Sequence, residues 1–88
     1  MPRYHFHIHD GVSIPDPVGR ELPDLAAAQR VAIRFAAEMI EPISDIWSGH
    51  EWRLEVTDAH GLTLFLLDFV GTLAPAAQQH GSQDGSTR

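Results

Sequence analysis

The first residues of the chain alternate between apolar and histidine side chains. Tyr4, Phe6 and Ile8 occupy every second position of the segment 4–9, and His5, His7 and His9 occupy the positions between and after them. Successive side chains of a β-strand point to opposite faces, so this period of two predicts a strand with one apolar face and one face of histidines.

Short, irregular strands are expected next. Asp10-Gly11 is a turn signal, and residues 12–14 can begin a return strand. Prolines at positions 15 and 17 interrupt that strand, because proline donates no hydrogen bond to a ladder and is confined to edges or bulges. We expect residues 18–22 to resume as an irregular edge segment.

A helix is predicted to follow. Asp24 is a good N-cap residue, and from Leu25 onward the sequence is rich in alanine and other helix-forming residues. Pro42 must kink or end this helix, and we expect a kinked helix to about Ser48, with a break at Pro42 as the alternative. The apolar positions at three- and four-residue spacing predict a core stripe of Leu25, Ala28, Ala32, Phe35, Ala36 and Met39.

Two strands close the pattern. Residues 52–57 alternate between apolar and polar side chains, residues 58–61 form a hairpin turn signal, and residues 62–70 are apolar on both faces. The element order β-β-α-β-β predicts an α+β fold, with one kinked helix packed on one face of a small antiparallel sheet. We expect a single domain at residues 1–73 and a polar, disordered tail at residues 74–88.

The last strand and the helix carry more apolar residues than this fold buries. A sheet covered by one helix needs one apolar face per strand, and residues 62–70 have two. The surplus predicts an exposed patch that buries itself against a second copy, which makes a homodimer the expected state. The alternative is that Trp47, Trp52 and the segment 70–77 cover the patch within one chain. The predicted interface consists of Phe65, Leu67, Phe69, Ile33 and Ile40.

Composition excludes several chemistries. The 88 residues contain no cysteine and no lysine, which excludes disulfides, zinc–thiolate sites, thiol nucleophiles and Schiff-base chemistry. A net charge of −6 with scattered arginines argues against nucleic acid as a partner. No apolar run approaches the roughly 20 residues of a membrane span, and no secretory signal precedes the first strand, so we expect a cytoplasmic protein. None of the serines has the context of a nucleophile, and an enzyme is not expected.

The histidine row is the main candidate for site chemistry. Residues two apart on a strand lie about 7 Å apart, so His5 and His7, or His7 and His9, can converge on one zinc or other transition-metal ion. Glu55 or Asp10 can complete such a site, and Glu51, His60 and Asp16 are further candidates. The alternatives are a pH-responsive surface or the plain polar face of a half-exposed strand.

Particular motifs resemble those of a known family. The chain has Met1-Pro-Arg-Tyr, His7, Asp10-Gly11, Asp16, Gly19, Glu21-Leu-Pro-Asp-Leu25 and an alanine-rich helix, then Val56-Thr-Asp58 and Gly61. This pattern resembles a family of small bacterial proteins known only as a domain of unknown function, over roughly residues 1–70. The resemblance implies a shared fold and carries no activity. His5 and His9 depart from the usual first strand of that family, so the row is largely peculiar to this chain.

The sequence is compatible with three functions. The leading hypothesis is a non-catalytic protein-interaction module that self-associates through the apolar strand and helix surface. One alternative is a metal-binding or metal-sensing protein that uses the histidine row. The other is an antitoxin-like regulator that binds a partner protein, which rests only on the order of a small sheet and an alanine-rich helix.

Overall fold

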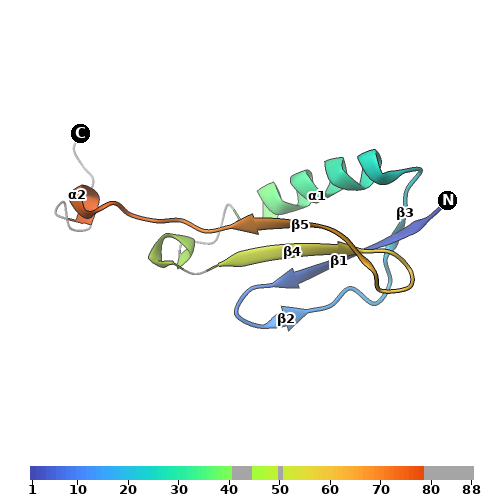
Figure 1. Cartoon of the computed structure of the whole chain (residues 1–88), viewed down its shortest axis with the longest axis horizontal. Coiled ribbons are helices and arrows are strands. Elements are labelled where there is room, and N and C mark those ends of the chain that lie inside the picture. The colour runs from blue at the N-terminus through green and yellow to red at the C-terminus, as the bar shows by residue number, and fades with distance from the viewer. Residues whose placement is uncertain (41–44, 50, 79–88) are drawn as a thin grey trace.

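One antiparallel sheet and one long helix form the body of the protein (Figure 1). The computed structural model describes residues 1–40, 45–49 and 51–78. The sheet contains three main strands and two strands of two residues each: β1 (Arg3–His9), β4 (Trp52–Thr57) and β5 (Thr63–Phe69), with β2 (Ser13–Ile14) and β3 (Arg20–Glu21). The predicted α+β fold and the order of its strands around the helix are confirmed.

The strand order across the sheet is β2-β1-β4-β5, and β3 pairs with the other end of β1. His7 lies opposite Glu55 of β4, and Glu55 in turn lies opposite Leu66 of β5. The two edges of the sheet therefore differ. One edge is formed by the short β2 and β3, and the other by the seven residues of β5.

The apolar residues of the alternating strands form the core, as predicted. Tyr4, Phe6 and Ile8 of β1 are buried, as are Trp52, Leu54 and Val56 of β4. Phe6 pairs with Val56 and Ile8 with Leu54, so the apolar side chains share one face of the sheet. We call it the helix face, because the helix packs against it. The opposite face, called the open face, carries His5, His7, His9, Arg53, Glu55 and Leu66.

The helix α1 (Leu25–Ile40) begins where the sequence predicts. The Oδ1 atom of Asp24 accepts a hydrogen bond from the N–H of Ala27 at 2.8 Å, which is an N-cap. Four alanines face the sheet and are buried, because their small side chains let the helix approach the strands closely: Ala27, Ala28, Ala32 and Ala36.

The predicted core stripe of the helix is wrong at its two ends. Leu25 and Met39, in the first and last turns, are exposed. Val31 packs against the core together with Phe35, so the stripe is shifted toward one flank of the alanines. α1 ends at Ile40, and a 3₁₀-helix, η1 (Asp45–Ser48), precedes β4. The predicted kink at Pro42 lies outside the described residues.

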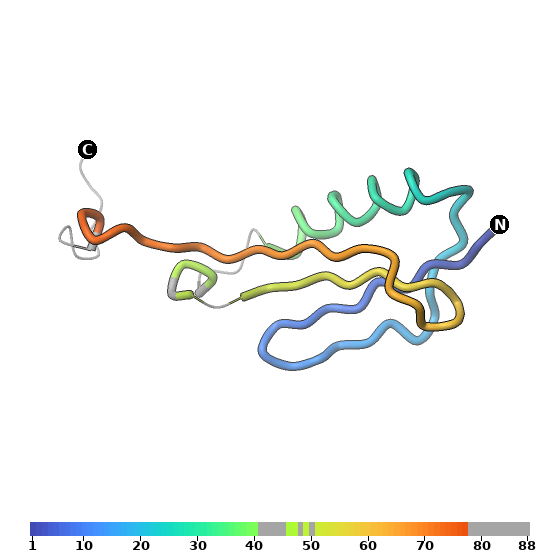
Figure 2. The backbone as a smooth tube through the Cα atoms, viewed as in Figure 1, coloured from blue at the N-terminus to red at the C-terminus, as the bar shows by residue number. Residues whose placement is uncertain are grey.

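An extended arm follows β5 and leads to a short helix, α2 (Pro75–Gln78), away from the sheet (Figure 2). Gly71 anchors the arm, because its N–H donates a hydrogen bond to the carbonyl oxygen of Ile46 at 3.0 Å. A Cβ atom at Gly71 would lie 2.6 Å from the ring of Trp47, so only glycine fits there. α2 occupies four residues that the sequence assigned to a disordered tail, and residues 79–88 lie outside the described chain. Among the described helices, none has both the length and the apolar character needed to cross a membrane.

Candidate functional site

The histidine row lies on the open face and is half-buried rather than freely exposed. The alternation that buries Phe6 and Ile8 places His5, His7 and His9 on the other side of β1. The rings of His5 and His7 are parallel, with 6.1 Å between their centroids and 6° between their planes. The loop between β2 and β3 crosses beside these two rings and holds them in place through Asp16.

Two histidines hold the backbone of Asp16 in that loop. The N–H of Asp16 donates to Nδ1 of His7 at 3.0 Å, and the carbonyl oxygen of Asp16 lies 2.9 Å from Nδ1 of His5. Both polar backbone groups of one residue are thus satisfied by side chains of β1, as a neighbouring strand would satisfy them. We call this arrangement of His5, His7 and Asp16 the Asp16 clamp.

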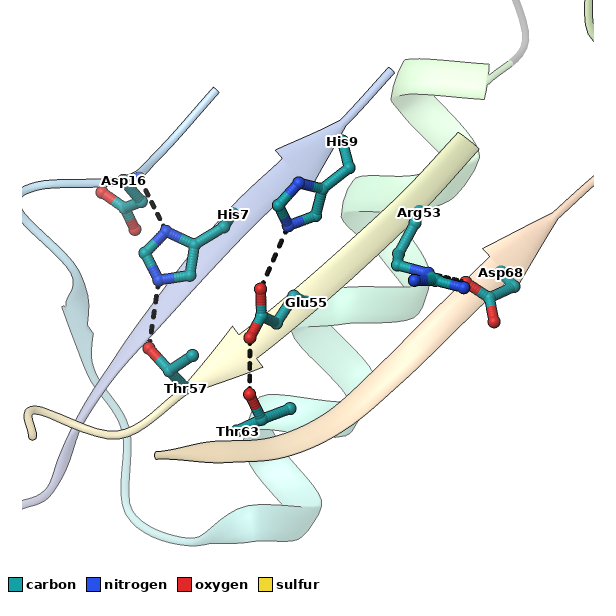
Figure 3. Close-up of polar contacts among 8 residues, drawn as sticks. All are labelled: His7, His9, Asp16, Arg53, Glu55, Thr57, Thr63 and Asp68. Carbon is teal, nitrogen blue, oxygen red and sulfur yellow. Dashed lines mark hydrogen bonds and ion pairs between the residues drawn. The ribbon is translucent and has the colours of Figure 1, made fainter. Parts of the chain in front are cut away.

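The clamp requires two different histidine tautomers. A carbonyl oxygen only accepts, so His5 must carry its proton on Nδ1. His7 accepts on Nδ1 and therefore carries its proton on Nε2, from which it donates to Oγ1 of Thr57 at 3.0 Å (Figure 3). A doubly protonated His7 has no lone pair on Nδ1, so the contact with the Asp16 N–H exists only while His7 is neutral.

The carboxylate of Asp16 completes the attachment of the loop. It accepts hydrogen bonds from the backbone N–H groups of Phe6 at 3.1 Å, Val18 at 3.1 Å and Gly19 at 3.0 Å. Burial raises the pKa of Asp16, but the donors from Gly19, Phe6 and Val18 outweigh it and leave that pKa below the usual value. Asp16 therefore stays ionised at neutral pH and ties the loop to β1.

Glu55 joins the three main strands on the open face. One carboxylate oxygen lies 3.0 Å from Nε2 of His9 on β1, and the other accepts from the hydroxyl of Thr63 on β5 (Figure 3). The hydrogen bonds from Thr63 and His9 lower the pKa of Glu55. Next to these contacts of Glu55, Arg53 forms an ion pair with Asp68, its register partner on β5. The open face is consequently a network of cross-strand polar contacts.

The metal candidates are only partly brought together. β4 lies beside β1, so Glu55 is next to the histidine row, but His9 is the one histidine of the row with which it forms a hydrogen bond. Asp10 follows β1, and its backbone N–H donates to the carbonyl oxygen of Val12. In the described part of the chain, no three histidine, aspartate or glutamate side chains gather in a way that could hold a metal ion.

The predicted interface residues divide between two environments. Phe65, Leu67 and Ile40 pack against the core, so the assignment of Phe65 and Leu67 to an open face is wrong. The register explains the difference, because Phe65 lies opposite Val56 and Leu67 opposite Leu54, on the helix face. Ile33 and Phe69 are exposed.

Leu66 lies on the open face of β5, and other exposed apolar residues lie in or beside this strand, where a register shift between Val56 and Thr57 interrupts the alternation of faces. Leu62 is 65% exposed, Leu64 38% and Leu66 46%, and Val70 follows at 57%. The sequence shows an apolar surplus in this strand correctly, but it does not show which face the helix covers.

The Asp16 clamp was not predicted from the sequence, although one local signal points to part of it. Asp16 was named only as a candidate ligand near the end of the strand. Its spacing to Gly19 is a local signal for an aspartate that caps its own turn, and Gly19 has a φ of +76°. The contacts with His5 and His7 depend on how the loop returns across β1, which no local pattern specifies.

A family model matches residues 3–70, and its description is Domain of unknown function (DUF6894). The chain belongs to this family. The match runs from β1 to the residue after β5, so the DUF6894 domain comprises the sheet and α1, and the arm with α2 lies beyond the match. The family resemblance inferred from the sequence motifs is confirmed. Neither the curated proteins nor the solved structures yielded a match.

Proposed function

We propose that this DUF6894 domain is a non-catalytic interaction module that self-associates through β5. The observation that carries the proposal is the edge position of this strand. β5 has seven residues and pairs only with β4 among the described strands. An edge strand presents a row of unpaired backbone N–H and C=O groups, which is a template for another strand.

The contrast between the two edges supports this choice. The edge formed by β2 and β3 consists of two-residue strands, with prolines 15 and 17 between them. Short edge strands and prolines both hinder the addition of another strand. β5 has no proline, and its one charged residue, Asp68, is already paired with Arg53 of the same chain. The usual devices that protect an edge are therefore concentrated on the opposite side of the sheet.

A second copy is the partner that fits the pattern of β5. An antiparallel pair of β5 strands with a two-fold axis at Leu66 would place Leu66 beside its own symmetry mate. The same register sets Leu62 opposite Val70 of the second copy, and both are more than half exposed in one chain. It also continues the helix face, because Phe65 would meet Leu67 of the second copy. Apolar pairs would thus be buried on both faces, while Leu64 would lie opposite Asp68 of the second copy.

The polar network of the open face supports a non-catalytic role. His7 contacts the hydroxyl of Thr57, but Thr57 is buried and out of reach of a substrate. Both carboxylate oxygens of Glu55 are engaged in hydrogen bonds, one with His9 and the other with Thr63. Nothing in the described residues favours the metal-binding or the antitoxin-like alternative over self-association.

Light scattering coupled to size-exclusion chromatography tests the proposal. We expect the untagged chain to elute with twice its monomer mass. Leu66→Lys should shift it to the monomer mass, because a charge at the centre of an edge strand opposes strand pairing. Val12→Lys is the matched control, since Val12 is exposed in the turn between β1 and β2. A monomeric wild type, or a dimeric Leu66→Lys variant that stays folded by circular dichroism, would overturn the proposal.

A further inference from the structure

A groove lies on the side of the sheet farthest from β5, between α1 and the loop that joins β2 to β3. Its volume is about 600 Å³, within the range of roughly 300–1,000 Å³ that is typical of small-molecule sites. Apolar side chains of β1, β2 and α1 line its interior: Phe6, Ile8, Ile14, Val31 and Phe35.

The wall of the groove is preformed. Pro15, Asp16, Pro17 and Gly19 contribute to it, and the Asp16 clamp fixes this stretch to β1 through both backbone groups of Asp16. Two prolines further restrict the loop. A ligand entering the groove therefore need not order this wall, which lowers the entropic cost of binding.

Two guanidinium groups at the groove can pair with an anionic group. Arg20 and Arg34 line it, and neither has an ion pair in the described part of the chain. Two carboxylates also line it, but that of Asp16 is committed to three backbone N–H donors. With Glu38 as the second carboxylate, the formal charges of the lining therefore balance, and the two guanidinium groups, rather than a net positive charge, are what the groove offers to an anion.

We propose that this groove binds a small carboxylic acid with an apolar body. The body would lie against Phe6, Val31 and Phe35, and the carboxylate would pair with Arg34 and Arg20. Guanidinium groups pair well with carboxylates because their planar donors match the two oxygens. This site is independent of self-association, because β5 lies at the other edge of the sheet.

Titration with 4-phenylbutyrate, followed by calorimetry and by NMR of the backbone amides, tests the site. We expect saturable binding at one site per chain, with the amides of Val31, Phe35 and Gly19 among those that shift. Two related probes separate the contributions of body and charge. The neutral 4-phenylbutanamide has the same body and should bind at least about tenfold more weakly, since hydrogen bonds to charged groups are worth more than neutral ones. Acetate has the charge without the body and should not saturate the site.

Removal of a positive charge and removal of a negative charge at the groove should change the affinity for 4-phenylbutyrate in opposite directions. Arg34→Gln and Arg20→Gln should each weaken 4-phenylbutyrate binding at least about tenfold. Glu38→Gln should tighten it. Arg30→Gln is the matched control, because Arg30 lies one turn before Arg34 on α1 and does not line the groove.

Three outcomes would overturn the proposal. The first is the absence of saturable binding. The second is equal affinity for 4-phenylbutanamide, which would leave an apolar groove without selectivity for a carboxylate. The third is an equal loss of affinity in Arg30→Gln and Arg34→Gln, which would mean that general surface charge attracts the anion. Since none of these variants lies on β5, the result does not depend on the oligomeric state.

Discussion

The backbone N–H of Asp16 donates a hydrogen bond to Nδ1 of His7 at 3.0 Å, which ties a loop between two prolines to the first strand of the sheet. His5 contacts the carbonyl oxygen of the same residue. These contacts give two of the three histidines of β1 a structural role: they act as a substitute for a neighbouring strand. They also position the loop that forms one wall of the groove beside α1.

Loss of His7 should loosen the loop. His7→Ala removes the acceptor of the Asp16 N–H and the donor to Thr57, and leaving such groups unsatisfied costs about 1–3 kcal/mol of stability. We expect a lower urea midpoint and faster hydrogen exchange at the Asp16 amide. His60→Ala is the control, because His60 lies exposed in the hairpin turn and its loss should change stability by less than about 0.5 kcal/mol. Equal effects of the two substitutions would contradict the role assigned to His7.

A methyl group at Gly19 should disturb the clamp directly. Its Cβ would lie 2.8 Å from Cε1 of His5 and 2.9 Å from Cγ of Arg3, and the φ of +76° is itself unfavourable for alanine. Gly61→Ala is a matched control, because Gly61 has a φ of +85° but no atom within 4 Å of the added Cβ. The backbone penalty of about 1–2 kcal/mol is common to both variants, so Gly19→Ala should lose more stability than Gly61→Ala. It should also shift the imidazole NMR signals of His5. A smaller loss in Gly19→Ala would show that His5 is not held close to the loop.

The carboxylate of Asp16 should make stability depend on pH. Its pKa is below the usual value in the folded protein, so its contribution is complete above the unfolded pKa and is lost as the pH falls through the folded one. Glu55, with a lowered pKa, acts in the same direction. We expect the free energy of urea unfolding to fall between about pH 5 and pH 3, with a shallower fall in Asp16→Asn. Identical slopes for the two proteins would mean that Asp16 contributes nothing to the pH dependence.

The sequence predicts those parts of the fold that depend on neighbouring residues. Alternation identifies β1 and β4 together with their buried faces, and Asp24 marks the start of α1, because each signal lies within a few residues. The faces of β5 could not be assigned in this way. Its residues are apolar on both sides, and only the pairing of Phe65 with Val56 places one side under the helix.

The same limit applies to the candidate sites. The histidine row is evident from the sequence, and Glu55 was expected near it because β4 was a candidate neighbour of β1. The partner of His5 and His7 is the backbone of Asp16, and no pattern of side-chain types records a contact made by a backbone group. The groove was missed for a related reason, since Arg20 and Arg34 come together only when α1 packs beside the β2–β3 loop.

The most direct test of self-association through β5 uses single cysteines, because the natural chain has none. In the proposed register Leu66→Cys places two thiols side by side at the two-fold axis, whereas Leu62→Cys places its two thiols about eight residues apart along the strands, or about 27 Å. A short bismaleimide should therefore crosslink Leu66→Cys into a covalent dimer and leave Leu62→Cys monomeric. Failure to crosslink Leu66→Cys, or equal crosslinking of both variants, would contradict the proposed pairing of β5.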